Sequence, residues 1–80
     1  MSRDISVADI VVHLHPDTTP DCKADIEQGL RAQEGVVSVH FNEEDHPHAV
    51  VVAYDPRVVK SEKLLAVIRE CDPAAVMAGF

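Results

Sequence analysis

The stretch HLHPDTTPDC, residues 13–22, marks the change from a strand pattern to a helical pattern. Thr19 is a favourable N-cap, Pro20 suits the first helical position, and Asp21 complements the positive end of a helix. Cys22 then falls in the first helical turn, where free backbone N–H groups and the helix dipole favour a thiolate. The stretch also carries two of the five histidines and one of the two cysteines, so we expect the chemistry of the chain to lie here.

The residues before this stretch predict a strand over 9–15. Alternation places three aliphatic side chains on one side, which should face the core: Ile10, Val12 and Leu14. His13 and His15 lie on the opposite side, where each could equally be an ordinary solvated residue.

The residues after it predict a helix over 20–34. One stripe recurs every four residues, at Cys22, Ile26 and Leu30. Gly29 beside this stripe indicates close packing against a neighbouring element, because a glycine inside a helix costs about 1 kcal/mol relative to alanine. Gly35 is the expected left-handed C-cap.

Two further strands are expected over 36–42 and 49–54. In the first of them, one phase contains Val37, Val39 and Phe41. Residues 43–48, EEDHPH, are polar and interrupted by proline, which is typical of a hairpin loop. The second of these strands is nearly all apolar, so we expect it near the centre of the sheet.

A second helix is expected to follow Ser61 as its N-cap and to end before Asp72-Pro73. Its core-facing positions are Leu64, Leu65 and Ile68. A short last strand over 74–78 completes the order. The order predicts an α+β fold, a ferredoxin-like βαββαβ sandwich whose four-stranded antiparallel sheet, in the spatial order 4-1-3-2, has two helices on one face.

Length and composition limit the function. Eighty residues make one domain, 1–80, with a single core. Seven basic and fourteen acidic residues give a formal net charge of −7, which argues against nucleic-acid binding and suits a basic protein partner or a cation. No apolar run approaches the roughly 18 residues of a membrane span, and the start lacks the pattern of a signal peptide. We therefore expect a cytoplasmic protein without membrane insertion, whose two cysteines are thiols rather than a structural disulfide.

Four pieces of the sequence carry a resemblance to a known family: CKADIEQGL (22–30), GVVSVHFN (35–42), VVVAYDP (50–56) and LAVI (65–68). In this order and spacing, the chain resembles the heavy-metal-associated domains of copper chaperones and metal-transporting ATPases over nearly its full length. The resemblance implies the same ferredoxin-like fold and a role in binding a heavy-metal ion such as copper or zinc.

The metal motif of that family is only partly present. The family has Gly-Met-Thr-Cys-x-x-Cys, whereas residues 16–22 here are PDTTPDC. Cys22 matches the second cysteine, but Thr19 stands at the position of the first. Threonine is a poor ligand for Cu(I), which prefers thiolate or thioether sulfur. The usual pair of thiolates therefore cannot form from this loop alone.

The predicted topology offers replacement ligands. The end of the first strand, the hairpin after the second strand and the exit of the second helix share one end of the domain, and these places hold His13, His15, Cys22, His46, His48 and Cys71. A mixed Cys/His set suits zinc, copper or nickel better than Ca²⁺ or Mg²⁺. We expect an atypical metal site formed by Cys22, His15, His13 and Cys71, although Cys71 could equally be a small buried hydrophobic residue.

Two other functions remain open at this stage. The chain could be a protein-interaction or homodimerisation module without metal, using the open sheet face beside His13 that carries Val11, Val51 and Ala53. It could also be a thiol-redox protein that uses Cys22, with Cys71 as the resolving thiol. No phosphate-binding glycine loop, nucleophile elbow or paired-carboxylate motif is present, so we do not expect an enzyme.

Overall fold

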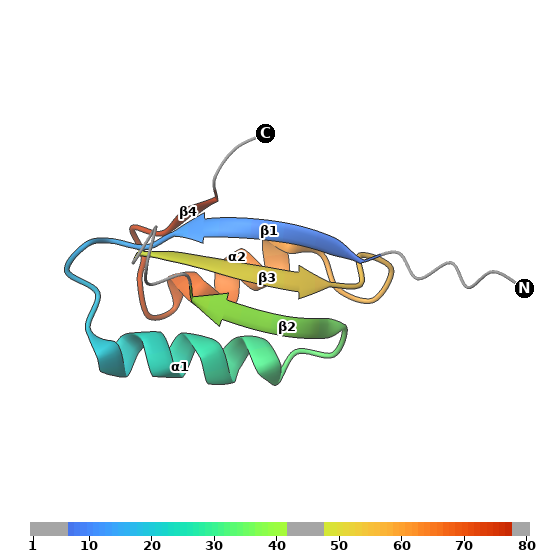
Figure 1. The fold of residues 1–80 in the computed structure, drawn as a ribbon, viewed down its shortest axis with the longest axis horizontal. Helices are drawn as coiled ribbons and strands as arrows, with labels where there is room; N and C mark the ends of the chain where they lie inside the picture. The colour runs from blue at the N-terminus through green and yellow to red at the C-terminus, as the bar shows by residue number, and fades with distance from the viewer. Residues whose placement is uncertain (1–6, 42–47, 78–80) are drawn as a thin grey trace, which may run out of the picture.

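The computed structural model describes residues 7–41 and 48–77. Its elements are β1 (Ala8–His13), α1 (Pro20–Arg31), β2 (Val36–Phe41), β3 (Ala49–Tyr54), α2 (Ser61–Arg69) and β4 (Val76–Met77), shown in Figure 1. All but the last residue of the expected hairpin loop, 43–48, lies outside the described residues.

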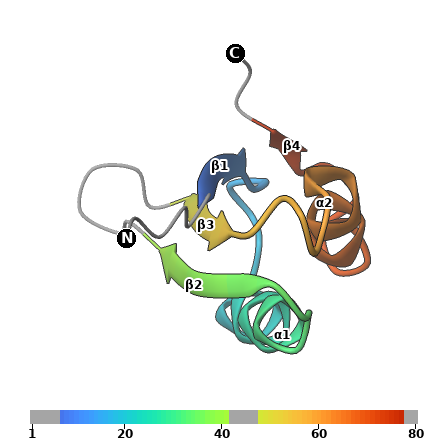
Figure 2. The ribbon, with the colours of Figure 1, turned by 90° about the vertical axis from the view of Figure 1, so that its right-hand side faces the viewer.

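The four strands form one antiparallel sheet in the order β2-β3-β1-β4. Both helices lie on the same side of this sheet (Figure 2). The predicted ferredoxin-like arrangement and the predicted strand order are confirmed. In the described part of the chain, no helix is long and apolar enough to cross a membrane.

The core lies between the sheet and the two helices. The prediction that Ile10, Val12 and Leu14 face the core is confirmed, because these side chains are 4%, 0% and 5% exposed. The helices contribute the fully buried side chains Ile26, Leu30, Leu64 and Ile68.

A β-bulge in β2 changes the alternation that the sequence predicts. Val36 pairs with Tyr54 of β3, while Ser38 pairs with the next residue of that strand, so Val37 is an extra residue without a partner. Val37 is consequently 63% exposed, whereas Val39 is buried. The expectation that Val37 and Val39 share one phase of the strand is wrong.

Several element ends also differ from the expected ones, including that of β1, which ends at His13 rather than at His15. α1 ends at Arg31, so Gly35 is not its C-cap. Gly35 has a φ of +98° in the turn before β2, and its carbonyl accepts a hydrogen bond from the N–H of Asp55 at 2.8 Å. α2 begins at Ser61 itself, with Lys60 as the N-cap residue and no side-chain capping bond. The last strand, β4, has two residues rather than the five expected.

The two helices meet at Gly29. A Cβ added at Gly29 would lie 3.0 Å from Cγ1 of Val67 in α2. The close packing that this glycine predicts is therefore confirmed, and its partner is the second helix.

Candidate functional site

The two cysteines form a disulfide, Cys22–Cys71, with their Cα atoms 5.9 Å apart. This distance is within the ordinary range for such bonds. The sequence separation is 49 residues, but the start of α1 and the end of α2 lie at the same end of the domain (Figure 1). The expectation of two free thiols is therefore wrong in this structure. Cys71 is also exposed rather than buried, while Cys22 is half-buried against the core.

Thr19 caps α1 as the sequence predicts. Its Oγ1 accepts a hydrogen bond from the backbone N–H of Cys22 at 3.1 Å. The residue at the position of the family's first cysteine thus stabilises the start of the helix that carries the second.

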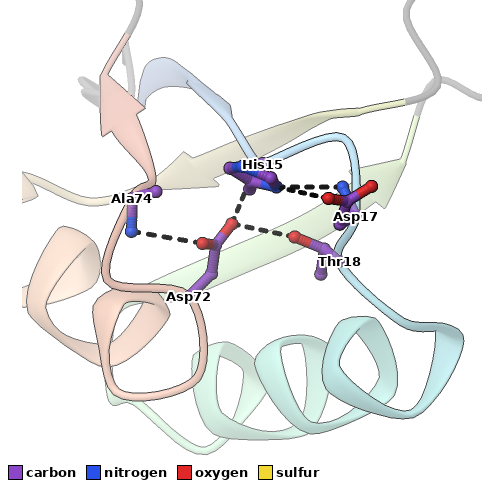
Figure 3. A network of polar contacts seen from close by, with 5 residues as sticks. All are labelled: His15, Asp17, Thr18, Asp72 and Ala74. Atoms are coloured by element: carbon purple, nitrogen blue, oxygen red, sulfur yellow. Dashed lines mark hydrogen bonds and ion pairs between the residues drawn. The ribbon is translucent and has the colours of Figure 1, made fainter.

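Asp72 connects the loop before α1 to the turn after α2 (Figure 3). Its side chain is buried, with the residue only 5% exposed. Oδ2 accepts hydrogen bonds from the backbone N–H of His15 at 2.8 Å and from the hydroxyl of Thr18 at 3.0 Å. Oδ1 accepts one from the backbone N–H of Ala74 at 3.2 Å. The bonds from His15 and Thr18 join the two cysteine-bearing segments, and the bond from Ala74 holds the turn that carries Asp72.

The same bonds determine the ionisation of Asp72. Burial by itself raises the pKa of this carboxyl, but the bonds from His15, Thr18 and Ala74 outweigh burial and lower the pKa below its ordinary value. Asp72 is therefore a carboxylate at neutral pH.

A pocket of about 490 Å³ opens beside the disulfide, and His15 is part of its wall. Nδ1 of His15 accepts a hydrogen bond from the backbone N–H of Asp17 at 3.0 Å. In the neutral ring the proton is then on Nε2. The full lining is His15, Asp17, Thr18, Thr19, Cys22, Cys71, Asp72, Pro73 and Ala74.

Several solved structures have the same shape as this chain. Oxidised MerP from Ralstonia metallidurans CH34 is 16% identical in sequence and superposes with a TM-score of 0.71. The match covers 91% of this chain and 96% of MerP. The metallochaperone CopZ is 21% identical, with coverages of 89% and 100% and a TM-score of 0.68. The CCC2A domain of the yeast copper transporter is 22% identical, with coverages of 89% and 94% and a TM-score of 0.70. The chain has the fold of a heavy-metal-associated domain.

The resemblance seen in the sequence is thereby confirmed at the level of the fold. No protein-family model matches the chain, and no curated protein matches it by sequence. Within this fold, the disulfide and Asp72 lie at the end of the domain where α1 begins and α2 ends.

Of the four predicted ligands, Cys22, Cys71 and His15 line the pocket and His13 does not. His13 is exposed at the end of β1, where it pairs with Ala49 of β3 and Val76 of β4. With the cysteines bonded to each other, residues 7–41 and 48–77 contain no group of three or more His, Cys, Asp or Glu residues that could hold a metal ion.

Neither histidine of the expected hairpin is found among the described residues that line the pocket. His46 lies outside the described residues. The carbonyl of His48 accepts a hydrogen bond from the N–H of Leu14 at 2.7 Å, and its buried Nδ1 has no hydrogen-bond partner among the residues that the structure describes. His48 therefore lies beside the loop that begins the site, but it is absent from the pocket lining.

Sequence reasoning did not identify Asp72 as a site residue. An aspartate before a proline is typical of a helix end, and that reading fully accounts for it. Its loop partners, His15 and Thr18, are 57 and 54 residues away, so no local pattern connects them.

Proposed function

We propose that this chain is a heavy-metal-binding domain of the metallochaperone type, which holds a soft ion between the reduced thiolates of Cys22 and Cys71. The observation that carries the proposal is the 5.9 Å separation of the two Cα atoms. Cys71 would supply the second thiolate that Thr19 cannot supply.

The donor set favours Cu(I) over zinc. Two thiolates are the soft ligands that Cu(I) prefers, whereas a structural zinc ion takes four N or S ligands. His15 in the pocket wall could provide a third donor. His13 stays a predicted ligand that would need the end of β1 to approach the pocket. The sulfurs of a disulfide are not thiolates, so this binding requires the reduced chain.

Transfer of the ion would involve a second protein. The net charge of −7 favours a partner with a basic surface, and we place both in the cytoplasm. The proposed role is to bind and pass on an ion, with no catalysed reaction. Homodimerisation on the open sheet face remains the alternative partner arrangement.

A titration of the fully reduced chain with Cu(I) under anaerobic conditions, in competition with a coloured chelator, tests this function. We expect one ion per chain, and a loss of affinity of roughly a hundredfold or more in Cys22→Ser and in Cys71→Ser, because each removes one of the two thiolates. His15→Ala should weaken binding by about tenfold.

His40→Ala is the matched control, since this exposed histidine on β2 does not line the pocket. Its affinity should equal that of the unchanged chain. Circular dichroism of each reduced variant establishes that it is folded. Unchanged Cu(I) affinity in a folded Cys71→Ser variant would show that Cys71 is not a ligand and would refute the proposal.

A further inference from the structure

Both cysteines of the chain are bonded to each other, so the structure as described has no thiol to offer a metal. We infer that Cys22–Cys71 is a site of thiol–disulfide exchange, at which a small uncharged or cationic thiol attacks Cys71 and releases Cys22. The inference of an exchange reaction is based on the disulfide and the residues around it. The further claim, that reduction allows the chain to bind a metal ion, rests on the proposed function.

The disulfide is accessible to a small molecule. Both cysteines line the pocket of about 490 Å³, a volume typical of small-ligand sites. Cys71 is exposed, whereas Cys22 is half-buried and packs against the core. A thiol in this pocket therefore reaches the sulfur of Cys71 more easily.

The two helices make the sulfurs unequal as leaving groups. Cys22 lies in the first turn of the twelve-residue α1, where the positive end of the helix dipole stabilises a thiolate. Cys71 follows the end of α2, and its N–H is bonded to the carbonyl of Ile68 at 3.1 Å. The negative end of the α2 dipole disfavours a thiolate there. Because the sulfur of lower pKa leaves faster, cleavage should release Cys22.

The reaction is balanced as follows. The incoming thiolate forms a bond to Sγ of Cys71, the bond between the two cysteines breaks, and its electron pair goes to Sγ of Cys22. The product is a mixed disulfide on Cys71 and a thiolate on Cys22. A second thiol attacks the mixed disulfide, leaving Cys71 as a thiol and releasing the oxidised dimer of the reagent. Two thiols are oxidised for one protein disulfide reduced.

The charges around the pocket select the reagent. Among the residues that the structure describes, its lining contains the carboxylates Asp17 and Asp72 and the imidazole of His15, but no lysine or arginine. An anionic thiol is repelled by these carboxylates and a cationic aminothiol is attracted.

Mapping the mixed disulfide tests the direction of attack. The oxidised chain, whose mass should be lower than that of the reduced chain by two hydrogens, is mixed with cysteamine and quenched with acid at early times. Alkylation and peptide mass spectrometry should then find cysteamine on Cys71 and the alkyl group on Cys22. Cysteamine found first on Cys22, or a freshly purified chain that never oxidises, would overturn the inference.

Single-cysteine variants test the leaving group without the disulfide. At pH 7, Cys22 in Cys71→Ser should react with iodoacetamide roughly tenfold faster than Cys71 in Cys22→Ser, because the start of α1 favours a thiolate and the end of α2 disfavours one. Equal rates, or a faster Cys71, would remove the basis for the release of Cys22.

A set of small thiols tests the charge preference. The rate of disulfide cleavage in the protein is measured with cysteamine, mercaptoethanol and mercaptopropionate. Each rate is divided by the rate at which the same reagent cleaves an uncharged small disulfide, which corrects for the intrinsic reactivity of the reagent. At low salt the corrected rate for cysteamine should exceed that for mercaptopropionate by roughly fivefold, and the difference should shrink at 1 M salt. A preference for the anionic thiol would contradict the assigned reagent class.

Metal titration of the oxidised chain separates this inference from the proposed function. If both hold, the oxidised chain binds no Cu(I) until cysteamine has reduced it. If exchange proceeds on Cys71 but the reduced chain binds no ion, the proposed function fails and the exchange site stands. Strong binding by a chain that remains oxidised would refute the consequence for metal loading.

Discussion

Gly35 combines a positive φ of 98° with close neighbours on the turn after β3. A Cβ at this position would lie 2.9 Å from Cβ of Val58 and 3.1 Å from Cγ1 of Val59. Backbone strain and steric overlap therefore act together. We expect Gly35→Ala to lower the free energy of unfolding by about 2 kcal/mol, measured by urea denaturation.

Gly29→Ala is the appropriate control for that substitution. Gly29 lies in a helical backbone, and its added Cβ would meet the side chain of Val67 at 3.0 Å. The gain of about 1 kcal/mol in helix propensity offsets this contact, so the net change should be small. Equal losses from the two substitutions would contradict the account of Gly35.

Asp72 is the residue at which the pH should act on stability. Its folded pKa is lowered from the ordinary 3.8, so its stabilising contribution is fully present above that value and is lost as the pH falls through the lower, folded pKa. We expect Asp72→Asn to reduce stability at pH 7 and to remove part of the acid sensitivity below about pH 3.8. Urea denaturation of both chains from pH 7 to pH 2 measures this, and parallel pH profiles would contradict it.

Individual residues were predictable where their partners are near in sequence. The capping by Thr19 follows from three consecutive residues, and the structure confirms it through the bond from Cys22. Asp72 was not predictable, because its function in the structure depends on a loop more than fifty residues away.

Packing of α1 on α2 is the contact between elements that supports the site most directly. The close approach at Gly29 sets how near the helices lie, and the disulfide joins one end of the same pair. We expect Gly29→Leu to push Val67 away, to lower stability by about 2 kcal/mol and to slow closure of the reduced Cys22–Cys71 pair by an oxidant.

Val67→Ala provides the matched compensation. Removing the Val67 methyl groups makes room opposite Gly29, so stability and closure rate in the double variant Gly29→Leu, Val67→Ala should recover part of the loss. Double-mutant cycles in urea, with oxidation followed by mass spectrometry, measure both. Strictly additive losses would show that the two residues are not coupled.

At the scale of elements, the sequence predicted the strands with strong apolar runs and both helices. β1 and β3 follow from alternation and from a run of aliphatic residues, and their antiparallel pairing is continuous over six residue pairs. The bulge at Val37 was not predictable, since an extra residue in β2 is defined only against the register of β3. β4 is too short to have a periodicity of its own.

At the scale of the whole molecule, the fold predicted that the chemistry-bearing residues gather at one end. Topology alone placed Cys22 and Cys71 near each other, but not at bonding distance, because that depends on how the loop 14–19 and the turn 71–74 are held. The three hydrogen bonds of Asp72 provide this hold. The prediction of free thiols followed from the expected cytoplasmic location. That expectation carries no information about the distance between the two cysteines.

Reduction of the disulfide should lower the stability of the whole domain. Cross-linking residues 49 apart removes chain entropy from the unfolded state, worth about 4 kcal/mol in the loop-closure treatment. Urea denaturation with and without a reducing agent measures the difference. The variant with both Cys22→Ser and Cys71→Ser should match the reduced chain and be insensitive to the reagent.

The disulfide also divides the chain mechanically. Cys22 and Cys71 enclose most of α1, β2, β3 and α2 in one covalent ring, while β1 and β4 lie outside it and pair with each other. A force applied to the two chain ends would peel β1 and β4 away and then stop at the ring. In the oxidised chain, the extension on unfolding should be shorter by ~170 Å than in the reduced chain, because 49 residues at about 3.5 Å each cannot be drawn out.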